Sequence, residues 1–268
     1  MTVATNSRLL ARIVPVDAID RVDRQMMYRL LASHFVGPDR ATFEADLAEK
    51  SCTILLEDDT GAVRGFSTLL VYRTCVGGCP MSVVYSGDTI VERSWWGSAT
   101  LPRAWIRAVR TLAPANGTPL YWFLLTSGYR TYRFLPVFFR SFYPKHDDPS
   151  QAGVDLLHTI ARNRFGTRYD STTGIVRLAK PQVLKSDLLV LPTGRALDPH
   201  VAFFLARNPG HVHGDELACL ARIHDDNLTA AGLRMTRYAD ERETINSRDA
   251  DHADARGTIY SRDADPRG

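Results

Sequence analysis

The sequence has few cysteines, and they form no metal-binding or disulfide pattern. There are four in 268 residues, none in a paired C-x-x-C motif: Cys52, Cys75, Cys79 and Cys219. Cys75 and Cys79 flank a Gly-Gly pair, which is more typical of a turn between two strands than of half a metal site. We therefore expect free thiols and no metal ligands.

Long apolar runs and a basic-then-apolar leader are also missing, so we expect a cytoplasmic protein without a membrane span. The 33 basic residues exceed the 30 acidic ones by only three. This balance gives no reason to expect a nucleic-acid partner. A hydrophobic content of 44% is enough for a core of ordinary globular size.

Large apolar residues nearly vanish after Met235, and the charged pentapeptide SRDAD occurs twice, at Ser247 and Ser261. Such a segment buries too little surface to offset chain entropy, so residues 236–268 are expected to be a disordered tail. We divide the remainder into a core over residues 1–145 and an α/β extension over residues 146–235 that packs on it.

The core alternates helical and strand patterns. Helical spacing over residues 20–31 and 43–47 makes the opening helical, and an apolar hairpin with its turn at residues 58–61 follows. A strand over residues 83–91, a helix from Leu101, a buried strand over residues 118–126 and an aromatic helix interrupted by Pro136 complete the order. This alternation predicts a mixed α/β sheet flanked by helices.

The connection after residue 91 is rich in small residues and feeds a helix. Unpaired backbone N–H groups and the helix dipole at such a helix start attract phosphate. Gly97 allows close approach of an anion, and Ser98 and Ala99 keep the surface shallow. Arg93 and Arg103 add positive charge. The alternative is a plain strand-to-helix connection.

The segment Ser94-Trp95-Trp96-Gly97-Ser98-Ala99, together with the element order, resembles the Gcn5-related N-acetyltransferase (GNAT) superfamily. The pyrophosphate loop of that superfamily reads Q/R-x-x-G-x-G/A, and here Ser94 occupies its first position. The chain is closest in style to the branch of N-acyl amino acid synthases and acyl-homoserine lactone synthases. The segment DPHVAFFLARNPGHVHGDELACLARI is similar to the late helix and strand of that branch.

The resemblance implies an N-acyltransferase that moves an acyl group from a pantetheine thioester to an amine by direct attack. The donor is acyl-CoA or acyl-phosphopantetheine on an acyl carrier protein, as a co-substrate with no tightly bound cofactor. The donor-binding residues it implies are Val91, Arg93, Trp95, Trp96, Gly97, Ser98 and Ala99. The tryptophans and the aromatic cluster after Tyr121 can line an acyl channel or form a plain core.

The resemblance also implies an acid and a base. Asp88 and Glu92 are the candidate bases, and the alternative for each is a solvated strand residue or an ion pair. Tyr132 is preferred as the acid over Tyr129 and Tyr143. In SGYRTYR, four residues are candidates for binding an anionic part of the substrate: Ser127, Tyr129, Arg130 and Arg133. The alternative for the two arginines is a solvated helix face.

The expected partners are a small-molecule amine and, as a second carrier, an acyl carrier protein; the oligomeric state is left open. A non-catalytic module that keeps this fold to bind a ligand or protein is the alternative function. A third hypothesis places a metal at His211 and His213, beside Asp215 and Glu216.

Overall fold

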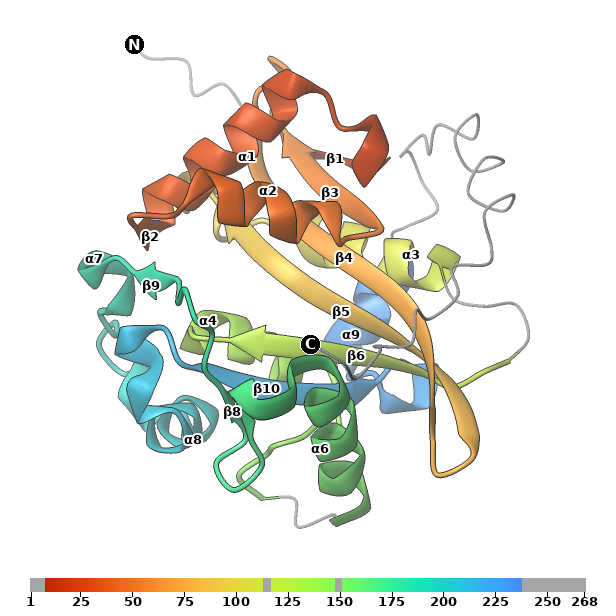
Figure 1. The fold of residues 1–268 in the computed structure, drawn as a ribbon. Helices are drawn as coiled ribbons and strands as arrows, with labels where there is room; N and C mark the ends of the chain where they lie inside the picture. The colour runs from red at the N-terminus through yellow and green to blue at the C-terminus, as the bar shows by residue number, and fades with distance from the viewer. Residues whose placement is uncertain (1–7, 113–116, 148–150, 238–268) are drawn as a thin grey trace, which may run out of the picture.

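The strand patterns of the sequence assemble into one mixed sheet in the computed structural model, which describes residues 8–112, 117–147 and 151–237 (Figure 1). Eight strands lie in the order β1-β3-β4-β5-β6-β10-β8-β7, antiparallel except for the parallel pair β5–β6. The predicted fold class, a mixed sheet flanked by helices, is confirmed. The bounds are β1 (Leu10–Pro15), β3 (Cys52–Glu57), β4 (Val63–Val76), β5 (Cys79–Val91), β6 (Leu120–Thr126), β7 (Tyr169–Asp170), β8 (Ile175–Val176) and β10 (Glu216–Arg222).

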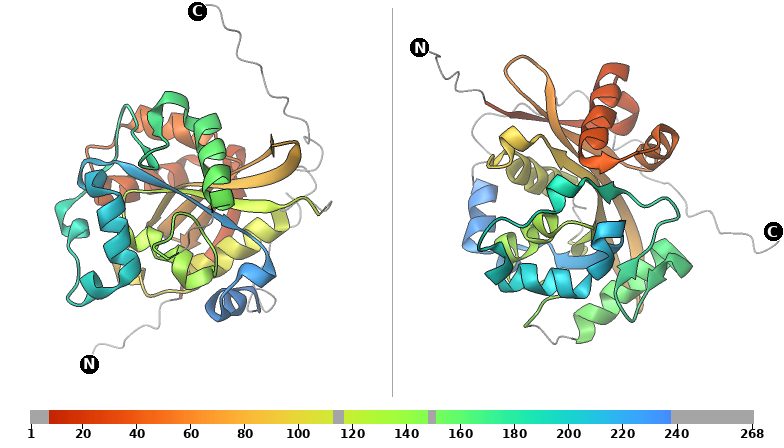
Figure 2. Two further views of the ribbon diagram at one scale, coloured as in Figure 1. Left: turned by 90° about the horizontal axis from the view of Figure 1, so that it is seen from below. Right: turned by 90° about the vertical axis from the view of Figure 1, so that its left-hand side faces the viewer.

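Helices cover both faces of this sheet, as the right-hand view of Figure 2 shows edge-on. One face carries α1 (Arg21–His34), α2 (Arg40–Ala48) and α6 (Gln151–Phe165). The other carries α3 (Thr100–Leu112), α4 (Tyr129–Tyr132), α5 (Phe134–Phe138), α8 (Pro199–Arg207) and α9 (Ala230–Arg237). A second, two-stranded sheet pairs β2 (Phe35–Val36) with β9 (Val183–Leu184), and α7 (Ser186–Leu189) follows it.

The two predicted hairpins form through the turn chemistry of their sequences. The Asp58 carboxylate accepts hydrogen bonds from the backbone N–H groups of Thr60 and Ala62, which fixes the β3–β4 turn. Gly77 and Gly78, with φ of 56° and 79°, supply the left-handed backbone that a two-residue β-hairpin turn needs. The neighbouring cysteines are exposed free thiols, as expected.

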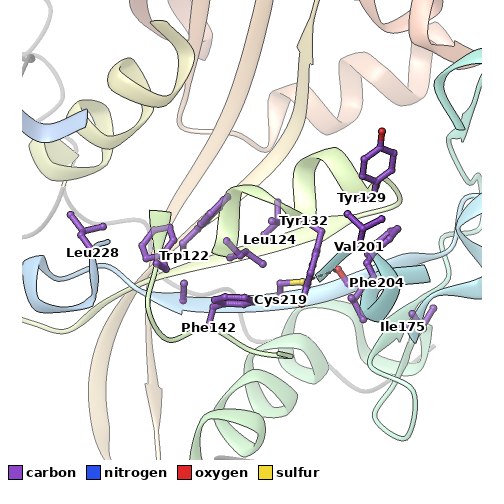
Figure 3. Close-up of a cluster of buried hydrophobic side chains, with 14 residues drawn as sticks. Trp122, Leu124, Tyr129, Tyr132, Phe142, Ile175, Val201, Phe204, Cys219 and Leu228 are labelled. Carbon is purple, nitrogen blue, oxygen red and sulfur yellow. Dashed lines mark hydrogen bonds between the residues drawn. The ribbon is translucent and has the colours of Figure 1, made fainter. Parts of the chain in front are cut away.

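The core consists of alternating strand residues packed against the apolar stripes of the helices. On β6, Trp122 and Leu124 point to the face that carries α4 and α5, whereas Phe123 and Leu125 point to α6. Figure 3 shows the first of these layers, in which side chains of β6, β10, α4 and α8 meet. A strand buried on both faces explains the unbroken apolar run LYWFLLT.

The structure corrects several sequence expectations. The opening is not helical throughout, because Leu10–Pro15 pairs with β3 as an edge strand before α1 begins. The aromatic helix breaks at Arg133, between α4 and α5, and Pro136 lies within α5. The late helix and strand of the extension are α8 and β10, and β10 lies between β6 and β8 in the main sheet.

The predicted disordered tail falls almost wholly on residues 238–268, outside the described residues, and its first two residues end α9. Among the described residues, no helix is long and apolar enough to span a membrane.

Candidate functional site

The parallel strands β5 and β6 separate before they end. Their pairing runs from Ser82 opposite Leu120 to Ser86 opposite Leu124 and stops there. Beyond this point β5 continues for five residues with β4 as its only strand partner in the described part of the chain, and Figure 1 shows the two arrows diverging toward their tips. A parallel sheet that opens at its carboxyl end exposes backbone groups between two strands, which is where open α/β sheets bind ligands.

A β-bulge lies at the point where the strands separate. Ser67 pairs with Thr89 and Leu69 pairs with Ser86, so Gly87 and Asp88 together oppose the single residue Thr68. A Cβ on Gly87 would lie 2.5 Å from the Thr68 hydroxyl and 2.6 Å from Cε of Lys50. The bulge therefore depends on glycine at this position, because the space beside it is already filled.

The opening between the strands is a cleft of about 420 Å³. We call it the central cleft. Its walls come from β5, β6, the loop after β5, α4, the small β2–β9 sheet and the start of β10. Sequence-predicted residues line it alongside others: Asp88, Val91, Trp95, Trp96, Ser98, Ser127, Tyr129, Arg130 and Arg133.

Two carboxyl groups lie in the wall of the central cleft, and both have raised pKa values. Burial is the main cause, and it raises the pKa of Asp88 to about 7. Burial and the negative charge of Asp88 raise the pKa of Glu216 to about 8. Asp46 adds to both shifts, while the buried Lys50 ammonium lowers the pKa of Asp88. A carboxyl group that titrates near neutral pH can take a proton from an amine.

Asp88 was predicted, whereas Glu216 was considered only as a companion of the two histidines. In the structure Glu216 begins β10, two strands away from Asp88, and lines the same cleft. His211 also lines the cleft, with Nδ1 2.8 Å from the backbone oxygen of Asn208. No group of three potential metal ligands occurs in the described part of the chain. Because more than a hundred residues separate Asp88 from Glu216 in the sequence, no local pattern predicts that the two carboxyl groups line the same cleft.

Glu92, the second candidate base, lies outside the lining of the cleft. Its carboxylate pairs with Arg64 at 3.2 Å and its backbone N–H donates to the Arg64 carbonyl. This is the ion-pair alternative that the sequence left open.

The candidate phosphate loop is a short 3₁₀ turn, Arg93–Trp95, followed by residues 96–99 before α3. The Ser98 N–H donates to the Trp95 carbonyl at 2.9 Å, so this donor is not free for a ligand. The N–H groups of Gly97 and Ala99 have no acceptor among the described residues. Nothing lies within 4 Å of the position of a Cβ on Gly97. The loop thus offers the backbone N–H groups of Gly97 and Ala99 to a ligand, but not that of Ser98.

Trp96 and two arginines that stack on its ring form a positively charged rim beside this loop. The guanidinium carbon of Arg130 lies 4.6 Å from the centre of the Trp96 ring, and that of Arg93 lies 5.4 Å away. Arg93 also pairs with Asp187 at 2.6 Å. Arg130 is exposed and has no carboxylate partner in the described ranges, so its charge is available to an anion. Arg133, by contrast, pairs with Asp198 at 3.0 Å.

The two tyrosines of α4 have different environments. Tyr132 is fully buried and does not line the central cleft, and its hydroxyl donates to the Pro144 carbonyl at 2.9 Å. Tyr129 is 6% exposed and lines the central cleft, and its hydroxyl is buried without a hydrogen-bond partner among the described residues. In Figure 3 this hydroxyl points away from the apolar cluster. An unpaired buried hydroxyl is costly, and a bound ligand would relieve that cost.

The sequence matches no protein-family model and no curated protein. Among solved structures, an Enterococcus faecalis protein described as "Probable N-Acyltransferase" is 11% identical, with a TM-score of 0.38 over 52% of this chain. The chain spans 33% of the length of that protein.

A GNAT family N-acetyltransferase from Escherichia coli, solved in complex with CoA, is 19% identical, with a TM-score of 0.36 over 50% of this chain and 71% of its own. The glucosamine-6-phosphate N-acetyltransferase of Arabidopsis thaliana is 11% identical, with a TM-score of 0.31 over 40% and 78%.

Proposed function

We propose that this protein is a GNAT-like N-acyltransferase that moves an acyl group from a pantetheine thioester to the amine of a small molecule. The observation that supports the proposal most directly is the opening of β5 from β6 at a bulge, beside two carboxyl groups that titrate near neutral pH. The donor arm would lie between the separated strands, where backbone groups of β5 beyond Ser86 are not bonded to β6.

In the proposed reaction, the neutral amine attacks the thioester carbonyl. A carbon–nitrogen bond forms and the carbon–sulfur bond breaks. The proton of the amine passes to the Asp88 carboxylate, and backbone N–H groups at the bulge would stabilise the oxyanion. The leaving thiolate takes a proton from the Tyr129 hydroxyl. The Tyr129 phenolate then regains a proton from the solvent, and the protonated Asp88 carboxyl releases the amine proton to the solvent. Tyr129 replaces Tyr132 as our candidate acid, because Tyr129 lines the cleft and its hydroxyl has no hydrogen-bond partner among the described residues, whereas the Tyr132 hydroxyl is bonded to Pro144.

The carrier end of the donor would lie at the rim. The backbone donors of Gly97 and Ala99 and the guanidinium of Arg130 are suited to a phosphate of coenzyme A or of a phosphopantetheine arm. The predicted roles of Trp95, Trp96 and Ser98 are compatible with their place in the cleft wall. An acyl carrier protein as the carrier, and the finer resemblance to N-acyl amino acid and acyl-homoserine lactone synthases, stay proposals.

The test is a thiol-release assay with acyl-CoA and a panel of amines. Release of free thiol that requires both donor and amine supports the proposal. Tight binding of coenzyme A without thiol release across the panel favours the non-catalytic module instead. The altered first loop position, Ser94, and the internal hydrogen bond of Ser98 are the observations that keep this second function in view.

A further inference from the structure

A second cavity lies beside the central cleft on the face that carries α3, α5 and α9. We call it the apolar chamber. It shares Thr89, Leu101, Pro102, Thr131 and Phe134 with the wall of the cleft, so the two spaces adjoin. Its remaining walls are largely apolar side chains of α3, β6, α5 and α9: Trp105, Ile106, Trp122, Phe138 and Met235.

Most of the polar side chains of the chamber wall bond to one another. The Ser86 hydroxyl accepts hydrogen bonds from the indole N–H groups of Trp105, at 3.3 Å, and Trp122, at 2.9 Å. The hydroxyls of Ser67 and Thr89 pair at 2.8 Å. A polar ligand would therefore find few free hydrogen-bond partners here, whereas an apolar ligand would leave no polar group of its own unpaired.

The volume of the chamber limits what it can hold. About 50 Å³ is open to the centre of a water molecule. A single water needs about 10–15 Å³ by this measure, which leaves room for roughly four atoms of that size. A methylene group is of similar size. An acetyl group would leave this space empty, and a long fatty chain would exceed it.

The geometry of β5 places this chamber beside the position where the thioester would be held. Successive residues of a strand point to opposite faces, so Thr89 borders the chamber, while Asp88 lies on the side where Asp46 of α2 and Lys50 act on its carboxyl. A thioester held at the bulge would have its acyl chain on one side of the sheet and the amine on the other. We infer that the apolar chamber binds the acyl chain of the donor, and that the preferred chain has about four to six carbons. This inference rests on the proposed function.

Binding of unreactive donors separates the two proposals. The probes are S-ethyl-, S-butyl-, S-hexyl- and S-decyl-pantetheine, thioethers that cannot transfer, measured by titration calorimetry on the full chain. We expect affinity to rise about fourfold per methylene up to hexyl, and then to stop rising. Affinity that is independent of chain length contradicts the inference that the apolar chamber binds the acyl chain, whether or not thiol release occurs. Chain-dependent binding without thiol release contradicts the proposed function but leaves the chamber intact.

Two variants of α5 make a matched pair. Phe138→Ala enlarges the chamber and should move the upper limit of chain length from hexyl toward decyl. Val137→Ala removes a neighbouring side chain that is 38% exposed and lines neither cavity, so it should leave the profile unchanged. Ile106→Phe fills the chamber from α3 and should remove the gain from butyl to hexyl. Equal profiles for Phe138→Ala and Val137→Ala would overturn the inference.

Discussion

Asp88 lies in the cleft with a pKa of about 7, so its charge changes within the pH range in which most enzymes work. As the proposed base it must be ionised, and the rate should rise with pH around 7. Asp88→Asn should lower kcat by about 10²–10⁴-fold and remove this rise. A pH–rate profile measures both effects.

Glu92→Gln is the control for this variant, because Glu92 pairs with Arg64 outside the cleft. Its kcat should stay within about twofold of the parent. Glu216→Gln should leave the rise in rate near the same pH, because Glu216, with a pKa of about 8, is still neutral while Asp88, with a pKa of about 7, loses its proton. A pH–rate profile that Asp88→Asn leaves intact would refute Asp88 as the base.

Tyr129 and Tyr132 lie three residues apart on α4, and their replacement by Phe should have opposite effects on kcat and on stability. Tyr129→Phe should lower kcat with little loss of stability, because its hydroxyl has no partner to lose in the described ranges. Tyr132→Phe should cost about 1 kcal/mol of unfolding free energy, from the lost bond to the Pro144 carbonyl, and keep kcat. Steady-state kinetics with urea denaturation distinguishes the two. The reverse result would return Tyr132 to the acid role.

These single residues also show where sequence reasoning reaches its limit. Asp88 could be found because it lies in the strand next to the candidate loop. Tyr129 and Tyr132 follow the same strand, and the sequence does not separate them. Only the packing of α4 places Tyr129 in the cleft wall and pairs the Tyr132 hydroxyl with the Pro144 carbonyl. Glu216 becomes the neighbour of Asp88 only through the insertion of β10 into the sheet, which no local pattern encodes.

At the scale of elements, the bulge in β5 is the device on which the cleft depends. Gly87→Ala should destabilise the protein by about 1–3 kcal/mol and lower activity, because the new Cβ would meet Thr68 and the fully buried Lys50 side chain. Gly97→Ala is its control, since a Cβ there meets nothing within 4 Å. Thermal denaturation compares them, and equal melting temperatures would mean that the bulge tolerates a side chain.

The elements that the sequence predicted well are those with a strong local signal. The two hairpins have turn residues of the required type, and α3 has an apolar stripe over its whole length. Leu10–Pro15 was missed because it is an edge strand with only Val14 buried within it, so its pattern is weak. The bulge itself was not predicted, since a single glycine in a strand is equally typical of a tight bend or of a close approach by another backbone.

At the scale of the whole molecule, the raised pKa values make stability depend on pH. Asp88 and Glu216 bind protons more tightly in the folded chain than in the unfolded one, where carboxyl groups titrate near pH ~4. Their contribution to stability is therefore greatest below about pH 4 and is lost as pH rises toward about 8. The double variant Asp88→Asn/Glu216→Gln should lose less unfolding free energy than the parent as pH rises over this range.

Urea denaturation at several values between about pH 5 and 8.5 measures this dependence. The parent should lose unfolding free energy over the range relative to the double variant. An equal slope for the two proteins would show that these carboxyl groups titrate alike in the folded and unfolded states.

The arrangement of the tryptophans gives the molecule its own optical reporter. The chain has four, of which Trp95 and Trp96 line the central cleft and Trp105 and Trp122 line the apolar chamber. Every indole fluorophore of the protein thus borders one of the two cavities. Intrinsic emission excited at the indole band is consequently a signal of cavity occupancy, with little background from elsewhere, and it needs no attached dye.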